Sequence, residues 1–417
     1  MKTASNRLSV VLIVLIGLLG KTAAADDATN QNLLVTPAYS VGLNTVGYWQ
    51  ALNHSNSDGS LKNLVTGFQS AAGNLNFRAN IADGIDLYFE IYLSSRHHEG
   101  QVSPREGYLM ITSAPSGINF MPVRKIFEVI DVKAGHFEIN YGNRHLRRSD
   151  NAQVQSNPLI GNDIVDPNVV YVGTEISTKP GRFNALLGIT NGQTTGDFQE
   201  GHQYAFHGKL WGEVTSFLSV AGSYYRADQS NNPIGYPDGG SFSNLFAGNR
   251  SGGRYADVLG GGGEPGQIRP GNGQDVTAWQ GDVALEVGQL TVQGHYGNIL
   301  DADINGTNPA DETTFGKVAE SWDYYSIQAV YGMGSPFHAA IRYTGTTAKE
   351  LYGAPATGKV ERVQVGIGLW IARGMLLKVE YVNQAYSEFD ADMKVDRMAV
   401  GLSPKFSGLI SEISISF

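Results

Sequence analysis

The amino-acid sequence predicts an all-β protein that crosses a membrane as a closed antiparallel barrel of about 16 strands. The chain repeats segments of about ten residues in which apolar and polar side chains alternate, the length that a tilted strand needs to cross a bilayer. It begins with an export signal, and no other segment approaches the roughly 18 consecutive apolar residues of a spanning helix. Because lipid offers no partner to an open sheet edge, strands can cross only as a closed barrel.

The composition agrees with a β protein and excludes several functional classes. The chain has 417 residues, with 52 glycines, no cysteine and 17% charged residues. The absence of cysteine excludes disulfides, thiolate metal sites and a cysteine nucleophile. A formal net charge of −9 argues against a nucleic-acid partner.

The first segment, 1–25, has the pattern of a secretory signal peptide. Lys2 and Arg7 are positive, an apolar stretch follows, and three alanines at 23–25 provide a small-residue cleavage site. A retained N-terminal anchor is the alternative, although the apolar stretch is too short to span a bilayer. We expect the segment to be removed on export and residues 26–417 to form the barrel.

Two neighbouring segments show the alternation clearly. In 85–95 the odd-numbered residues up to Leu93 are apolar and the even-numbered ones are polar. In 72–82 the odd-numbered residues from Leu75 to Ile81 are again apolar and the even-numbered ones from Asn74 to Asn80 are polar, and only Asp83 and Gly84 separate the two segments. This arrangement predicts a β-hairpin.

Sixteen segments share this pattern, and Lys394 to Leu402 could add another. They are 35–45, 72–82, 85–95, 105–114, 126–141, 168–178, 181–191, 203–213, 215–226, 276–287, 289–298, 321–332, 335–345, 360–372, 374–386 and 406–417. Long links follow the odd-numbered segments and short links follow the even-numbered ones, except the longer link 114–125. That asymmetry predicts long extracellular loops, short periplasmic turns and two periplasmic termini.

A soluble all-β protein is the alternative fold. Strands of soluble sandwiches average only about five or six residues, and the polar faces here carry charged and amide groups rather than core aliphatics. About sixteen strands enclose an aqueous channel, whereas about eight would be filled by side chains. The sequence therefore predicts a water-filled pore.

The chain resembles Gram-negative outer-membrane porins of the sixteen-stranded class. The signal peptide, the strand count and the terminal Phe417 carry this resemblance, and Val132–Gly142, Gly366–Trp370 and Lys378–Tyr381 are similar to segments of the phosphate-selective porin family. The resemblance implies an outer-membrane location, passive diffusion of small hydrophilic solutes or ions, and a homotrimer. It also implies recognition of Phe417 by the barrel-assembly machinery.

The loop after the fifth segment, 143–167, is the third long loop, which the resemblance implies folds inward to constrict the channel. Opposed basic and acidic groups there would filter solutes by charge and size. The candidate constriction and rim residues are Arg96, His97, His98, Arg105, Arg144, His145, Arg147, Arg148 and Asp150. The alternative is a solvated loop whose charges pair with one another or with lipopolysaccharide phosphates.

Carboxylates on the predicted lumen faces oppose the rim cations. They are Asp86, Glu90, Glu138 and Glu380. These acids favour cations, whereas a basic cluster at the mouth draws anions by local field focusing. The balance favours a slight preference for anions at the mouth but leaves the overall selectivity open.

A second long loop, 227–275, keeps other functions open. Its run of four glycines, 260–263, lacks the lysine and helix start of a phosphate cradle, so we expect an extracellular loop that could also dip into the pore. A non-transporting receptor or adhesin could use this loop to bind a partner.

A barrel enzyme is a further alternative, with lumen histidines His136, His207, His295 and His338, although no catalytic motif is present. No cofactor or metal is expected.

Overall fold

The structure is a computed structural model, and the description covers the residues whose placement is defined. These are 38–55, 66–68, 72–94, 103–115, 117–118, 120–143, 147, 152–167, 169–192, 204–228, 245–246, 255, 268, 275–307, 314–351, 353–389, 394–395, 398–399 and 405–417. The predicted signal peptide, 1–25, lies outside them. In this part of the chain, no helix is both long and apolar enough to cross a membrane.

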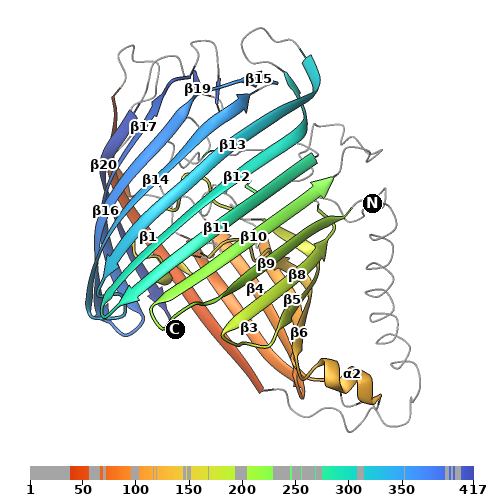
Figure 1. Cartoon of the computed structure of the whole chain (residues 1–417). Helices are drawn as coiled ribbons and strands as arrows, with labels where there is room; N and C mark the ends of the chain where they lie inside the picture. The colour runs from red at the N-terminus through yellow and green to blue at the C-terminus, as the bar shows by residue number, and fades with distance from the viewer. Residues whose placement is uncertain are drawn as a thin grey trace.

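Sixteen long strands form one closed antiparallel barrel (Figure 1). They are β1 (Ala38–Ser55), β3 (Ala72–Ala82), β4 (Ile85–Ser94), β5 (Ser103–Ile111), β6 (Ile130–Glu138), β7 (Val170–Thr178), β8 (Phe183–Thr190), β9 (Ala205–Glu213), β10 (Leu218–Asp228), β11 (Asp275–Val287), β12 (Leu290–Thr307), β13 (Thr314–Tyr331), β14 (Phe337–Leu351), β16 (Lys359–Ala372), β17 (Met375–Ser387) and β20 (Lys405–Ser416). Each pairs with the next long strand along the chain, and β1 pairs with β20 from Asn44 opposite Ser416 to Ser55 opposite Lys405. The predicted closed barrel is confirmed.

Several short elements decorate this barrel. Two-residue strands β2 (Gly67–Phe68) and β15 (Ala354–Pro355) extend the sheet beside β1 and β14, and β18 (Lys394–Val395) pairs with β19 (Met398–Ala399) as a separate hairpin. Helix α2 (Met121–Ile126) lies between β5 and β6, and a 3₁₀ turn covers Val154–Ser156.

Each predicted segment overlaps one long strand, but several bounds differ, and β12, β13 and β14 extend well beyond the segments predicted at 289–298, 321–332 and 335–345. Strand β1 covers 38–55 rather than 35–45. The segment considered as an extra strand, Lys394 to Leu402, supplies the small β18–β19 hairpin rather than a strand of the barrel. The link 114–125, too long for a simple turn, contains most of α2.

The outer face of the barrel is apolar, as the alternation predicts. Along β16, the outward side chains of Val363, Val365, Ile367, Leu369 and Ile371 are all exposed. The neighbours between them face inward, and Arg362 and Gln364 are buried. A contiguous apolar surface of this extent is typical of a lipid-facing wall rather than of a soluble monomer.

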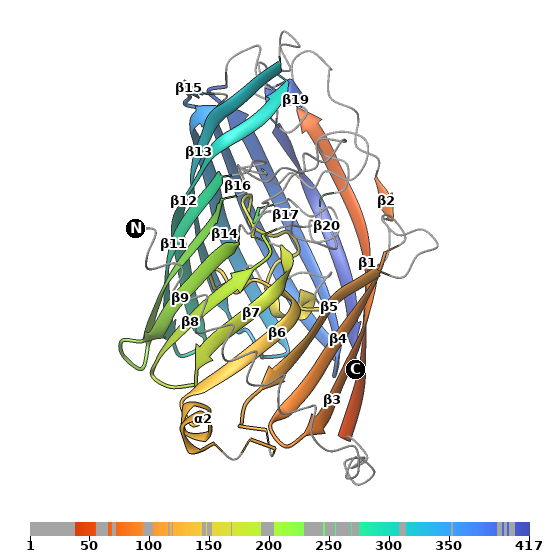
Figure 2. The ribbon, with the colours of Figure 1, turned by 90° about the vertical axis from the view of Figure 1, so that its right-hand side faces the viewer.

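The two rims of the barrel differ. One rim, which we call the short-turn end, carries links such as Asp83 and Gly84 between β3 and β4; the other, the long-loop end, carries the long connections (Figure 1). Strands are also uneven in length: β12 and β13 have 18 residues each, whereas β5, β6, β7 and β9 have nine each. The wall is therefore higher on the β12–β13 side (Figure 2).

Candidate functional site inside the barrel

The described part of the third long loop, residues 152–167, crosses the interior of the barrel; we call it the inner loop. It leaves β6, returns to β7, and contacts strands β13, β14, β16, β17 and β20, about half a turn around the barrel. Gln155 donates to the carbonyl of Gly374, in the turn between β16 and β17, at 2.9 Å. The loop therefore reaches the short-turn end.

Buried cations on the strands that the inner loop contacts bind its backbone carbonyls. Lys378 Nζ donates to the carbonyls of Val154, Asn157 and Leu159 at 2.9–3.1 Å, and it pairs with Glu412 at 2.6 Å. Buried backbone carbonyls need such partners, because a polar group that is buried without a hydrogen bond costs free energy. The Lys378 ammonium supplies three of these hydrogen bonds.

Two arginines hold the next part of the inner loop. Arg342 donates to the carbonyl of Gly161 at 2.7 Å and lies 3.7 Å from the carboxylate of Asp163, and Arg362 donates to the carbonyl of Asn162 at 2.7 Å. All of these groups are buried. We call the inward side chains of β13, β14, β16, β17 and β20 the loop-bearing wall.

Glu380 of the loop-bearing wall binds the inner loop with the opposite polarity. Its carboxylate accepts the backbone N–H groups of Ile160 at 2.6 Å and Gly161 at 3.1 Å. It also accepts the hydroxyl of Tyr255, from the second long loop. Burial, and then the nearby Glu380 carboxylate, raise the pKa of Tyr255 well above its ordinary value, so the phenol stays neutral and donates.

The inner loop packs closely against the loop-bearing wall. A Cβ at Gly161 would lie 2.0 Å from Tyr255 Oη, and a Cβ at Gly366 would lie 2.7 Å from Leu159 Cδ2. Both positions therefore need glycine because of close approach. The glycines let the backbone and side chains of the loop lie directly on the strands.

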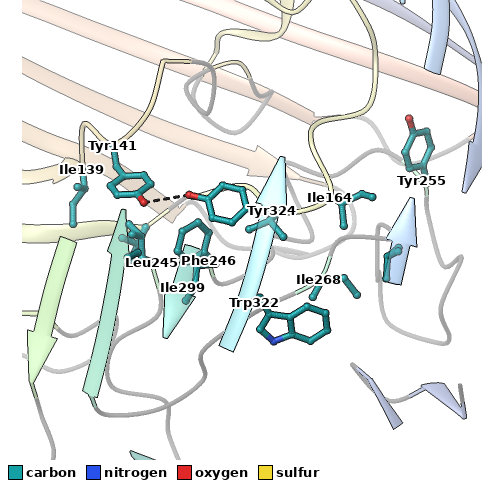
Figure 3. Packing of buried hydrophobic residues seen from close by; sticks show 14 of the residues in the cluster. Ile139, Tyr141, Ile164, Leu245, Phe246, Tyr255, Ile268, Ile299, Trp322 and Tyr324 are labelled. Carbon is teal, nitrogen blue, oxygen red and sulfur yellow. Dashed lines mark hydrogen bonds between the residues drawn. The ribbon is translucent and has the colours of Figure 1, made fainter. Parts of the chain in front are cut away.

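Apolar side chains from both long loops pack inside the long-loop half of the barrel. The described residues of the second long loop, Leu245, Phe246, Tyr255 and Ile268, are all buried there. Figure 3 shows the rings of Tyr141 and Tyr324 meeting through their hydroxyls, 3.2 Å apart, beside Phe246. The ring centroid of Phe246 lies 6.0 Å from Tyr141 and 5.7 Å from Tyr324. The second long loop thus enters the barrel at these positions.

The inward side chains of β3 to β9, which we call the facing wall, use their charges differently. Arg105 pairs with Glu138 at 2.8 Å, and Glu175 accepts from His207 at 2.8 Å and lies 3.5 Å from Lys133. The two pairs with Arg105 and Lys133 join neighbouring strands, and the contact between Glu175 and His207 joins β7 to β9 across β8. In these pairs a cation meets a carboxylate, whereas Lys209 of β9 donates to the carbonyl of Gly142 at 2.7 Å and to the side-chain oxygen of Asn140 at 3.0 Å.

The part of the facing wall near the short-turn end is open to solvent. Arg78 is exposed, and its guanidinium lies over the ring of Tyr88, 5.3 Å from the centroid. Tyr88 stacks on Tyr108 at 5.0 Å, and the ammonium of Lys133 lies 4.7 Å from the Tyr108 centroid. Tyr88, Tyr108 and Lys133 are partly exposed. Arg78 has no ion pair among the described residues.

The structure places some of the candidate residues and leaves others outside the described part. Arg96, His97, His98, Arg144, His145, Arg148 and Asp150 lie outside it. Arg147 is described and half-buried. Arg105 is buried against Glu138.

The four carboxylates chosen from the sequence divide into different environments. Asp86 is exposed near the short-turn end, where its carboxylate accepts from Asn80 at 2.9 Å. Glu90 is buried and accepts from Asn74 at 2.7 Å and Tyr88 at 2.6 Å. Glu138 and Glu380 are the partners of Arg105 and of the inner loop described above.

The four histidines considered for a barrel enzyme do not form one cluster in the structure. His207 binds Glu175 on the facing wall, and the ring of His338 lies 3.1 Å from the carbonyl of Pro158 in the inner loop. His136 lies on β6 and His295 on β12. No group of three or more His, Asp or Glu side chains among the described residues could hold a metal ion.

Sequence reasoning did not identify the residues that hold the inner loop. These are Lys378, Arg342, Arg362, Gln364 and Glu412. The available signal was the presence of cations at inward positions of three consecutive long strands, β14, β16 and β17. That signal shows that the side chains face inward but not what they bind.

Comparison with known proteins establishes the fold. No known protein family matches the sequence, and no curated protein is significantly similar to it. Among solved structures, the anion-selective porin from Comamonas acidovorans has a TM-score of 0.53 and 11% identity, covering 91% of this chain and 100% of that chain. OmpF of Salmonella typhi, in complex with daunomycin, has a TM-score of 0.53 and 12% identity, covering 91% and 97%.

A third similar structure is the outer-membrane channel DcaP of Acinetobacter baumannii. Its TM-score is 0.51 at 11% identity, covering 91% of this chain and 97% of that chain. The chain therefore has the transmembrane β-barrel fold of outer-membrane porins. The likeness covers nearly the whole described barrel.

Proposed function

We propose that the protein is an outer-membrane channel through which small hydrophilic solutes or ions diffuse passively. The observation that carries this proposal is the attachment of the inner-loop backbone to the loop-bearing wall. Its backbone is bound to Lys378, Arg342, Arg362 and Glu380, while the facing wall keeps exposed polar groups such as Arg78. Solutes would pass between the inner loop and the facing wall, with no cofactor and no turnover chemistry.

The orientation and export of the barrel follow from the same proposal. Residues 1–25 would direct export and be removed, the short-turn end would face the periplasm, and the long loops would face the exterior. Phe417, exposed at the end of the last strand, would be read by the barrel-assembly machinery. We also propose a homotrimer and contact between the long loops and lipopolysaccharide.

Two sets of charges would compete for ion selectivity. The rim cations Arg96, Arg144 and Arg148 favour anions at the mouth, as does the exposed Arg78 inside. Carboxylates such as Asp86 and Glu90 favour cations. An anion preference requires the cations to outweigh these acids, because the buried pairs such as Arg105 and Glu138 largely cancel each other.

Planar-bilayer recording of the mature barrel tests the proposal. Discrete, long-lived openings are expected, and the sign of the reversal potential under a salt gradient reports which set of charges dominates. A correctly folded, heat-modifiable barrel that conducts nothing would contradict a channel.

One observation favours a second candidate, a plugged receptor or adhesin. Leu245, Phe246, Tyr255 and Ile268 of the second long loop are buried inside the barrel. Shortening the loop 227–275 separates the two candidates. A channel keeps or increases its conductance, whereas a receptor or adhesin starts to conduct only after the loop is shortened and loses its partner.

A further inference from the structure

The segment 120–129, which contains α2, has an exposed apolar surface outside the strands. The side chains of Phe120 and Met121 are each 62% exposed, and that of Val129 is 61% exposed. None of the residues of α2 is buried, and its last turn carries Arg124 and Lys125. Three large apolar side chains and two adjacent cations therefore share one short segment.

The C-terminal end of this segment is held on the barrel by the turn between β7 and β8. The backbone N–H of Lys179, in the turn between β7 and β8, donates to the carbonyl of Val129 at 2.9 Å. The ammonium of Lys179 binds the carbonyl of Thr112 and the carboxylate of Asp131. Phe127, next to the helix, is buried. The segment 120–129 is therefore attached to the short-turn end of the barrel.

The segment lies at the short-turn end, beside the turn between β7 and β8 (Figures 1 and 2). This end of the barrel also carries a belt of exposed aromatic side chains. This belt consists of Phe183, Phe217, Tyr331 and Phe337, each at the end of a strand or in a short turn and at least half exposed. Aromatic girdles of this kind mark the water interface of a membrane barrel. The turn that holds the segment leads into β8, which begins with Phe183 of this belt, so the segment lies close to the lipid-facing surface.

We propose that the segment 120–129 is an interfacial anchor that binds the phospholipid surface of the periplasmic leaflet. Phe120, Met121 and Val129 would enter the boundary of the acyl chains, and Arg124 and Lys125 would pair with anionic phosphate groups. The segment has a net charge of +1, from two cations and Glu128, on a chain of net charge −9. This inference rests on the outer-membrane placement in the proposed function.

Spin labelling of the full-length protein in phospholipid vesicles tests the anchor. Because the chain has no cysteine, each introduced cysteine carries the only label. A nitroxide at Met121→Cys should collide with oxygen, which dissolves in lipid, at least several-fold more often than with a water-soluble nickel chelate. The belt position Phe337→Cys is the lipid control, and the exposed lumen position Asp86→Cys is the aqueous control.

The possible outcomes separate this inference from the proposed function. A Met121→Cys label as accessible to the nickel chelate as the Asp86→Cys label, while Phe337→Cys remains in lipid, overturns the anchor alone. A label shielded from both reagents also overturns it, because protein would then cover the segment. If Phe337→Cys is itself exposed to water, the membrane placement of the barrel is wrong.

The contribution of the cations is tested by lipid composition. In vesicles with anionic phospholipid, the Met121→Cys label should be deeper than in vesicles with only zwitterionic lipid. The combined Arg124→Gln and Lys125→Gln changes should abolish that difference while heat-modifiability and conductance stay unchanged. If the depth of the Met121→Cys label is independent of lipid charge while Arg124 and Lys125 are both present, the proposed pairing with phosphate groups is wrong.

Discussion

The loop-bearing wall and the facing wall contain the same kinds of residue but use them differently. On the loop-bearing wall, Lys378 and Arg362 donate to backbone carbonyls of the inner loop. On the facing wall, Arg105 and Lys133 lie against carboxylates of neighbouring strands. The first wall binds the inner loop, and the second keeps exposed side chains such as Arg78 near the short-turn end.

This difference shows that an inward-facing charge is not by itself evidence of a solute site. A buried lysine or arginine is tolerated only when its donors are satisfied, and backbone carbonyls do this as well as carboxylates. Lys378 and Arg362 would therefore contribute more to the shape of the channel than to its selectivity. Arg78, exposed on the facing wall, would do the reverse.

The largest expected effect comes from removing the ammonium that holds the inner loop. Lys378→Met leaves three loop carbonyls without their donor and Glu412 without its partner, so we expect a loss of about 3–5 kcal/mol in the free energy of unfolding. We also expect the loop to leave the wall and the single-channel conductance to change. Denaturant unfolding and planar-bilayer recording measure the two effects.

The double variant Lys378→Met with Glu412→Gln is the matched control for this prediction. It removes the unpaired buried carboxylate, so it should recover part of the stability while the altered conductance persists. If conductance returned to the original value in the double variant, the inner loop would not depend on the lysine for its position.

The same change on the facing wall tests the comparison directly. Arg105→Met leaves Glu138 buried without its guanidinium, so a destabilisation approaching that of Lys378→Met is expected, again about 3 kcal/mol or more. The inner loop keeps all of its partners on the loop-bearing wall, so open-channel conductance should change less than in Lys378→Met. Equal changes in conductance would contradict the division between the two walls.

The strands could be predicted from the sequence because their signal is local. Each long strand alternates with a period of two residues, and the outward face of β16 follows the predicted pattern from Val363 to Ile371. The inner-loop contacts could not be predicted in the same way. Lys378 and Val154 are separated by 224 residues, and no local pattern indicates their pairing.

The predicted site shows the same division between local and distant information. That the third loop lies inside the barrel came from the resemblance to porins, while its partners Arg342 and Glu380 became visible only in the fold. Glu380 lies on the inward face of β17. Its binding of the backbone of Ile160 and Gly161 depends on the register of β16, β17 and the inner loop together.

A smaller effect is expected where the inner loop touches the second long loop. Gly161→Ala places a Cβ 2.0 Å from Tyr255 Oη, so Tyr255 must move away from Glu380. We expect a loss of about 1–3 kcal/mol, typical of overpacking, and more frequent fluctuations of the open current. Gly222→Ala is the matched control, because nothing lies within 4 Å of a Cβ there. A similar loss in both variants would contradict a tight fit of the inner loop.

The smallest change should leave stability and conductance nearly intact and alter only selectivity. Arg78 is exposed, lies over the ring of Tyr88 and has no ion pair among the described residues, so in the proposed channel its charge would act on passing ions. Arg78→Gln should shift the reversal potential towards cations, and the shift should fall as salt rises because screening weakens the field. Arg124→Gln, the same change outside the barrel, should produce no shift. If both variants behave alike, the exposed part of the facing wall does not border the path of ions, because a charge beside that path must affect cations and anions in opposite directions.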